Sequence, residues 1–164
     1  GGVMVIVYAV KGFDGANLPL DNPLQVPAHR YSGRVLASGK EAVRTTPKFE
    51  RGRLLGDVVF VSGTAAIKGE DSEFSEDTRV QALGAIDVVE HLVAPSNISP
   101  DCSAFRFGYL RVYVRRPQDL EPVREMFISH FKDTPIHFLQ ADICRPELLL
   151  ELEGVGRALP FLKP

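Results

Sequence analysis

The sequence contains no tryptophan, only two cysteines and no long apolar run among its 164 residues. Cys102 and Cys144 have neither CxxC nor Cys/His spacing, which argues against a zinc site or a disulfide framework. A reducing cytoplasmic compartment fits this cysteine usage best. Residues 3–10 are apolar but too few to span a bilayer. No nucleotide-binding loop, HExxH motif or serine nucleophile elbow is present, so no metal or cofactor is predicted.

The chain also has no large excess of positive or negative charge. The net charge is −2 and the isoelectric point is near 6.1, which gives no electrostatic case for nucleic acid or for an anionic membrane surface. Hydrophobic residues make up 45% of the chain. This length and composition are typical of one globular domain that buries roughly two-thirds of its unfolded surface.

The first fifty residues differ in composition from the rest. Residues 3–10 are rich in β-branched side chains and predict a strand, whereas the glycines and prolines of residues 11–27 predict a loop or linker. We therefore expect a leading segment over residues 1–26, a single domain over residues 27–157 and a tail over residues 158–164. Residues 33–53 form a long polar connection, typical either of a lid or interface loop or of a disordered loop.

Regular elements follow from residue 54 onward. A turn followed by a strand is predicted for residues 54–63, and further strands are predicted for residues 105–114, 136–143 and 147–155. A helix with Ser75 as its N-cap is predicted to run to Val93, and a second has Pro122 in its first turn and Val123, Met126, Phe127 and either His130 or Phe131 facing inward. Two helices for at least four strands predict an α+β fold with both helices on one face of the sheet. Assembly about a symmetry axis would cover the other face.

The last predicted strand carries the strongest chemical signal. Its sequence, ELLLELEGV, places leucines on one face and puts Glu151 and Glu153 on the other. A carboxyl group on an otherwise apolar strand is costly to ionise, so its pKa rises toward neutrality, where it can give or take a proton. Glu151 is the candidate acid.

Three further groups of residues are candidates for binding. Arg111, Tyr113 and Arg115 share one strand face, which suits a carboxylate or phosphate but also suits a solvated surface. The small residues at the end of strand 54–63, including Gly63, Thr64 and Ala65, would let a ligand reach the backbone, or they form a simple turn. Structural and catalytic roles both remain open for His29 and His137, and Cys144 is either a buried hydrophobe or a pocket residue.

Several runs resemble the YjgF/RidA (endoribonuclease L-PSP) superfamily, namely GDVVFVSGTAAI, LRVYVRRPQDLEPVREMF and LELEGV. The resemblance covers about residues 27–157. It implies a chorismate-mutase-like α+β sheet and a homotrimer with ligand clefts between subunits. In simple members, which deaminate enamines and imines, the site residues correspond here to Tyr31, Gly63 and Glu151. The position of their substrate-binding arginine falls at about His137.

A closer resemblance is to the carboxyl-terminal domain of FkbO-like chorismatases, carried by DNPLQVPAHRYSG, RTTPKFERGRLLGDVVFVSGTAAI, LRVYVRRPQDL and ADICRPELLLELEG. Cys144 and Glu151 keep the spacing of that family's pocket cysteine and catalytic glutamate. The resemblance implies hydrolysis of the enolpyruvyl ether of chorismate to release pyruvate, with Glu151 as the general acid. The family's YRY motif reads His29-Arg30-Tyr31 here, and residues 3–10 resemble the junction to its second domain.

Three hypotheses follow for function. The first is a chorismatase-like hydrolase acting on chorismate or a related cyclic carboxylate, the second is a RidA-type enamine/imine deaminase, and the third is a non-catalytic trimer that binds a small molecule. All three predict a small-molecule carboxylate ligand and a homotrimer or pseudo-trimer. Besides Glu151, the residues expected to contact the ligand are Tyr31, Gly63, Thr64, Ala65, Arg111, Cys144, Arg145 and His137.

Overall fold

The computed structural model describes residues 9–33, 35, 46–73 and 76–161. Its main sheet has six strands, in the order β1 (Asn17–Leu20), β2 (Gly52–Leu55), β3 (Val58–Thr64), β8 (Leu150–Pro160), β6 (Cys102–Val114) and β7 (Ile136–Gln140). Neighbouring strands are antiparallel except for β6 and β7, which are parallel. The short strands β4 (Ile67–Lys68) and β5 (Asp71–Ser72) form a separate hairpin.

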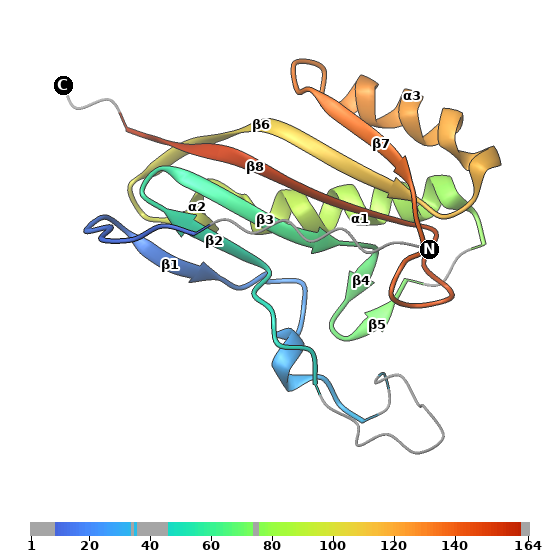
Figure 1. Cartoon of the computed structure of the whole chain (residues 1–164), viewed down its shortest axis with the longest axis horizontal. Helices are drawn as coiled ribbons and strands as arrows, with labels where there is room; N and C mark the ends of the chain where they lie inside the picture. Colours follow the sequence, from blue (N-terminus) through green and yellow to red (C-terminus); the bar gives the residue numbers. More distant parts are fainter. Residues whose placement is uncertain (1–8, 34, 36–45, 74–75, 162–164) are drawn as a thin grey trace.

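Two main helices cover one face of this sheet (Figure 1). They are α1 (Thr78–Leu92) and α3 (Leu120–His130), accompanied by the single turn α2 (Pro95–Ile98) and the 3-10 turns η1 (Ala28–Arg30) and η2 (Pro117–Asp119). Helix α1 begins two residues later than predicted, because Asp77 is its N-cap and accepts the Arg79 N–H at 2.8 Å. The predicted α+β class, with helices on one face, is confirmed.

The core lies between the two helices and the facing side of β6 and β8. Leu110 and Val112 of β6 and Leu150 and Leu152 of β8 are fully buried there, together with Phe127 of α3. Their spacing of two residues is the alternation read from the sequence, so the predicted inner faces of both strands are confirmed. Glu151 and Glu153 consequently project from the face that the helices do not cover, which we call the open face.

A β-bulge at Gly108 changes the face on which the aromatic side chains of β6 lie. Phe107 is paired with Gly156 and Tyr109 with Val155, so Gly108 is one extra residue in β6. The extra residue turns Phe105 and Phe107 toward the helices, whereas unbroken alternation would place both rings on the open face. There the ring of Phe107 meets that of Phe131 edge to face, with 5.6 Å between centroids.

Two elements extend beyond the predicted limits. Residues 11–27 were expected to be loop or linker because of their prolines and glycines, but they include β1, which pairs with β2 at the edge of the sheet. An edge strand tolerates Pro19 because one of its sides needs no ladder hydrogen bonds. Strand β8 continues to Pro160, so residues 158–160 of the expected tail are paired with β6.

Other boundaries are shorter or fall outside the described residues. Strand β7 ends at Gln140 rather than at residue 143. In α3, Val123 and Phe127 are buried as predicted, but His130 is exposed and lies 2.7 Å from Glu90, so it does not belong to the inner stripe. Residues 3–8 of the predicted first strand lie outside the described residues, as does most of the connection 33–53.

Two properties of the described helices and side chains bear on function. None of the helices combines the length and the apolar character that a membrane crossing requires. Within the described ranges, histidine, cysteine, aspartate and glutamate side chains do not gather in groups of three or more that could hold a metal ion.

Candidate active site on the open face of the sheet

Glu151 lies on the open face of β8, between β3 and β6. Its register partner in β6 is Tyr113, and on the β3 side its carboxyl group packs against Gly63. The pairing of β3 with β8 is irregular between Val61 and Thr64, so Gly63 lies at a break in the ladder. Any side chain at position 63 would collide with the Glu151 carboxyl oxygen. Glycine at this position therefore makes room for the acid, and sequence reasoning had singled out both residues.

The pKa of Glu151 is raised above its ordinary value of 4.5. The main cause is burial, which removes water from the ionised form, and the negative charge of Glu153 adds to it. Glu151 has no hydrogen bond or ion pair to any described residue that would favour ionisation. The group therefore keeps its proton to a higher pH than an ordinary glutamate, which is what a general acid requires.

The loop between β7 and β8 brings Cys144 close to Glu151. Cys144 is an exposed residue, yet its sulfur is withdrawn from water, which raises the pKa of the thiol, and the charge of Glu151 raises it further. Cys102 is the buried cysteine of the two, so Cys144 is not a buried hydrophobe, and its place in a ligand pocket stays a prediction. A thiol that holds its proton is a poor nucleophile, so the surroundings of Cys144 do not favour that role.

Two side chains hold this loop in place. Arg115 donates to the carbonyl oxygens of Ile143, Arg145 and Pro146 at 2.7, 2.9 and 3.1 Å. These bonds make Arg115 a structural residue, although its place on the strand had suggested a substrate arginine. The buried amide of Gln81 in α1 donates to the Glu147 carbonyl and accepts the Leu149 N–H, both at 2.8 Å.

Tyr31 lies in a cluster with two arginines. Its side chain is 8% exposed, and its hydroxyl accepts a hydrogen bond from Nη2 of Arg51. The guanidinium carbons of Arg51 and Arg145 lie 5.4 and 5.3 Å from the centre of the Tyr31 ring. Sequence reasoning identified Tyr31 and Arg145 but missed Arg51, which immediately precedes β2. Its carbonyl accepts the Ser62 N–H at 3.0 Å, so its main chain runs beside that of Gly63.

Arg111 and His137 lie one row of side chains further along the strands. In register, Glu153 of β8 faces Arg111 of β6, which faces His137 of β7. Arg111 Nε is 3.1 Å from the Glu153 carboxylate, and the Tyr113 hydroxyl donates to the same oxygen at 2.6 Å. Burial and the Glu153 carboxylate raise the pKa of Tyr113 to about 12. His137 is exposed and is separated from β8 by the whole of β6.

The side chains of Thr64 and Ala65 are both buried. Thr64 is 1% exposed and donates from Oγ1 to the Ser62 carbonyl at 2.9 Å. Ala65 is 3% exposed and packs with Ile143 and Leu148 under the β7–β8 loop. Contact of either residue with a ligand stays a prediction.

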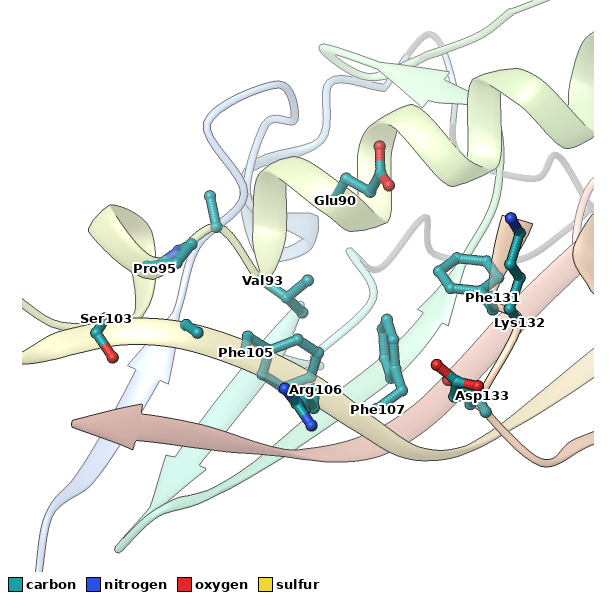
Figure 2. A pocket seen from close by; sticks show the side chains of 13 residues that line it. Glu90, Val93, Pro95, Ser103, Phe105, Arg106, Phe107, Phe131, Lys132 and Asp133 are labelled. Atoms are coloured by element: carbon teal, nitrogen blue, oxygen red, sulfur yellow. The ribbon is translucent and has the colours of Figure 1, made fainter. Parts of the chain in front are cut away.

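Two hollows of the described surface lie on opposite faces of the sheet. A groove of about 880 Å³ lies on the helix side, lined by the end of α1, the first half of β6 and the turn after α3. Figure 2 shows Phe105, Phe107 and Phe131 in this groove, with Glu90, Lys132 and Asp133 around them. It contains none of the predicted site residues. A smaller hollow of about 170 Å³ lies on the open face, lined by Ser62, Tyr109, Arg111 and Glu153 among others.

No protein-family model matches the sequence. A 3-hydroxybenzoate synthase from Streptomyces hygroscopicus is 32% identical over 169 residues, covering 94% of this chain and 47% of that protein. A chorismatase crystal structure superposes with a TM-score of 0.74 and 28% identity, covering 86% of this chain and 44% of that one. Chorismatases are homologues of this chain. The chain spans about half the length of the curated relatives it matches.

The fold that this chain shares with the chorismatase extends to more distant structures. A Mycobacterium tuberculosis member of the YjgF/YER057c/UK114 family superposes with a TM-score of 0.54 and 19% identity, covering 67% of this chain and 86% of that one. At this identity the likeness concerns the fold alone. The YjgF/RidA-like fold and the chorismatase homology expected from the sequence motifs are both confirmed.

Proposed function

We propose that this chain belongs to a chorismate-converting hydrolase and carries its general acid, Glu151. The observation that carries the proposal is a carboxyl group whose pKa is raised by burial, held against Gly63 with no ion pair to a described residue. A carboxylic acid in such surroundings can deliver a proton to a weakly basic atom at neutral pH. The chorismatase homologues supply the substrate class.

In the proposed reaction Glu151 protonates the methylene carbon of the enolpyruvyl ether of chorismate. The cation formed at the adjacent ether carbon is attacked by water, which returns a proton to the Glu151 carboxylate. The resulting hemiketal then breaks its bond to the ring oxygen, releasing pyruvate and leaving a hydroxyl group on the ring. One water is consumed and no electrons are transferred, so the step needs no cofactor.

The open face also supports the proposed trimer or pseudo-trimer. The helices leave Phe60, Tyr109, Val155 and the Arg111–Glu153 pair uncovered, around the 170 Å³ hollow. Half-buried aromatic and aliphatic side chains on an uncovered sheet face are typical of a surface that another subunit or domain covers. The mass of the protein in solution, measured by light scattering, tests this assembly, and a monomeric mass would contradict it.

A RidA-type deaminase would place a substrate-binding arginine near the position of His137. Here that position is an exposed histidine on β7, on the far side of β6 from Glu151. The hydrolase is therefore better supported than the deaminase, and both are better supported than a non-catalytic binding protein because burial raises the pKa of Glu151, as a general acid requires.

The deciding experiment is incubation of the purified protein with chorismate and measurement of pyruvate. We expect pyruvate to form and the Glu151→Gln variant to form none above the uncatalysed rate. A protein that binds chorismate but releases no pyruvate would contradict the hydrolase. An imino acid deaminated in the same preparation would then favour the RidA-type activity.

A further inference from the structure

The loop between β7 and β8 is bonded to the end of a core strand through one residue. Arg115 directly follows β6, and its guanidinium donates to the carbonyl oxygens of Ile143, Arg145 and Pro146 at 2.7, 2.9 and 3.1 Å. Its main-chain N–H donates to the Leu149 carbonyl at 2.8 Å. Arg115 therefore binds four carbonyl groups of the segment that leads into β8.

Arginine is the residue type that these bonds require. Its planar guanidinium carries five N–H donors and can serve several acceptors at once, whereas the lysine ammonium is a compact charge on a flexible stem. Arg115 is half-buried, and among the described residues its side chain donates to main-chain carbonyls alone. Its Nε is buried and has no hydrogen-bond partner. The guanidinium is thus committed to the loop rather than to a carboxylate.

The other hydrogen bonds of this loop hold different parts of it. Gln81 of α1 bonds to the main chain of its last residues, beyond the stretch 143–146. The side chain of Arg145 is tied to the β4–β5 hairpin, which lies outside the main sheet. Among the described hydrogen bonds, Arg115 is therefore the link between residues 143–146 and the main sheet. Its loss would free that stretch without unpairing β8.

The stretch that Arg115 holds lies beside the acid. Cys144 is close enough to Glu151 for that carboxylate to raise the pKa of its thiol. Ile143 belongs to a small apolar cluster against which Tyr113 packs, and Tyr113 is the register partner of Glu151 in β6. The loop thus contributes to the burial of Glu151, through residues whose main chain is bonded to Arg115.

Each element around Glu151 bears on its charge. The groups on these elements are Glu153 of β8, Tyr113 of β6, Cys144 and Arg145 of the loop, and Gly63 of β3, which carries no titratable side chain. Burial raises the pKa of Glu151 most, and Glu153 raises it further. The Tyr113 hydroxyl donates to Glu153. Because burial is the larger cause, water admitted on the loop side would lower the pKa of Glu151.

We infer that Arg115 is a positioning residue for the proposed hydrolysis, which holds residues 143–146 against the sheet and so keeps water from Glu151. The inference rests on the proposed function, in which Glu151 is the acid. The charge of Arg115 and its hydrogen bonds to the loop act on the acid in opposite directions. Loss of a nearby positive charge raises the pKa of a carboxyl group, whereas admission of water lowers it. The sign of the change therefore identifies the cause.

The pKa of Glu151 can be measured without turnover. Protein labelled with carbon-13 at its glutamate carboxyl carbons is titrated by NMR, and the signal missing from Glu151→Gln identifies the acid. We expect Arg115→Gln to lower this pKa, because the loop is no longer held against the sheet. Arg115→Lys keeps the charge but cannot serve three carbonyl groups in one plane, so its value should fall between the two. An unchanged or raised pKa in Arg115→Gln would overturn the inference.

The thiol of Cys144 provides a second measurement on the same variants. In Arg115→Gln it should react with iodoacetamide about 3- to 10-fold faster at pH 8, since a released loop exposes the thiol further and lowers its pKa. Peptide mass spectrometry separates this modification from that of the buried Cys102. With chorismate as substrate, the alkaline decline of kcat/KM should also move to lower pH. An unchanged alkylation rate would show that Arg115 does not hold the loop.

Arg116→Gln is the matched control, because Arg116 is the next residue and is also half-buried. It pairs with Asp119 at 2.5 Å and donates to Oγ1 of Thr78 at 2.8 Å, so its contacts are with the helix layer. The Glu151 pKa and the alkylation rate should match those of the original protein. Equal changes in both arginine variants would indicate a general loss of stability and overturn the positioning role. Thermal denaturation checks folding, and if Arg115→Gln does not fold, Arg115→Lys carries the test by the same criterion.

The two proposals fail in different ways. A Glu151 pKa that falls in Arg115→Gln, in a protein that releases no pyruvate from chorismate, would overturn the hydrolase and leave the hold of Arg115 on the acid's surroundings standing. Pyruvate release with a Glu151 pKa independent of Arg115 would overturn the positioning role and leave the hydrolase standing.

Discussion

The open face of the sheet carries two groups of charged residues that differ in how the charges are arranged. Around Glu153 the charges are joined, because Arg111 and the Tyr113 hydroxyl both contact its carboxylate. Around Glu151 they are kept apart, since its carboxyl group contacts Gly63 and Arg51 has no carboxylate partner among the described residues. A joined set is satisfied within the protein, whereas a separated set keeps groups that a ligand could pair with. Two glutamates on one strand face, two residues apart, thus lie in different electrostatic surroundings.

Exchanging the two carboxylates for amides is the strongest test of this difference. Glu151→Gln should lower pyruvate release by about 10²- to 10⁴-fold, because a glutamine cannot donate a proton to carbon. Glu153→Gln should retain activity within about tenfold, since Glu153 contacts Arg111 and Tyr113 rather than the reacting atoms. Initial rates of pyruvate formation from chorismate measure both. Equal losses in the two variants would show that the two groups do not differ in role.

The Gly63→Ala substitution should separate activity from stability. A methyl group at position 63 collides with the end of the Glu151 side chain, which can swing aside at little cost to folding. We expect kcat to fall about 10²-fold as the acid is displaced, with the melting temperature nearly unchanged. Gly108→Ala is the matched control, because its methyl group would meet only the Val155 carbonyl at 3.4 Å. Full activity in Gly63→Ala would mean that Glu151 need not contact position 63.

The pH dependence of kcat/KM should report the influence of Glu153 on Glu151. The charge of Glu153 raises the pKa of Glu151, so removing it in Glu153→Gln lowers that pKa. The acid must be protonated to react, and kcat/KM therefore declines as pH rises through its pKa. We expect the alkaline limb of the profile to move to lower pH in Glu153→Gln. A limb that stays in place would show that Arg111 fully screens Glu153 from Glu151.

The smallest expected effect is on stability. The folded protein holds the Glu151 proton more tightly than the unfolded chain, whose ordinary pKa is 4.5. The stabilisation this provides is complete below that value and is lost as pH rises through the higher folded pKa. Glu151→Gln does not ionise, so its melting temperature should gain on the original by on the order of 2 °C between pH 4 and 8. A constant difference across that range would contradict the raised pKa.

Alternation along the chain was enough to predict the faces of β8 and of the second half of β6. It placed Glu151 and Glu153 together opposite the core leucines, as the structure does. It could not predict the bulge at Gly108, because one extra residue in a strand leaves no periodic signal. Strand β1 was missed for a related reason, since Pro19 argues against a strand unless the strand is known to be at an edge.

The candidate site was predicted in part for the same physical reasons. Glu151, Gly63 and Tyr31 could be named from motifs, and the structure brings Glu151 and Gly63 into contact. Arg51 was missed because a single arginine beside a polar loop looks like a surface residue until its burial is known. The structural role of Arg115 could not be predicted, because its carbonyl partners lie about thirty residues away in the chain.

Gln81 of α1 is hydrogen-bonded to the segment that leads into Glu151. Its amide bonds to the Glu147 carbonyl and the Leu149 N–H in the way that a neighbouring strand would, just before β8 begins. Helix α1 thus supplies two hydrogen bonds of the kind that a strand would make to the residues just before β8. The segment that leads into Glu151 is therefore held by a helix side chain as well as by the sheet.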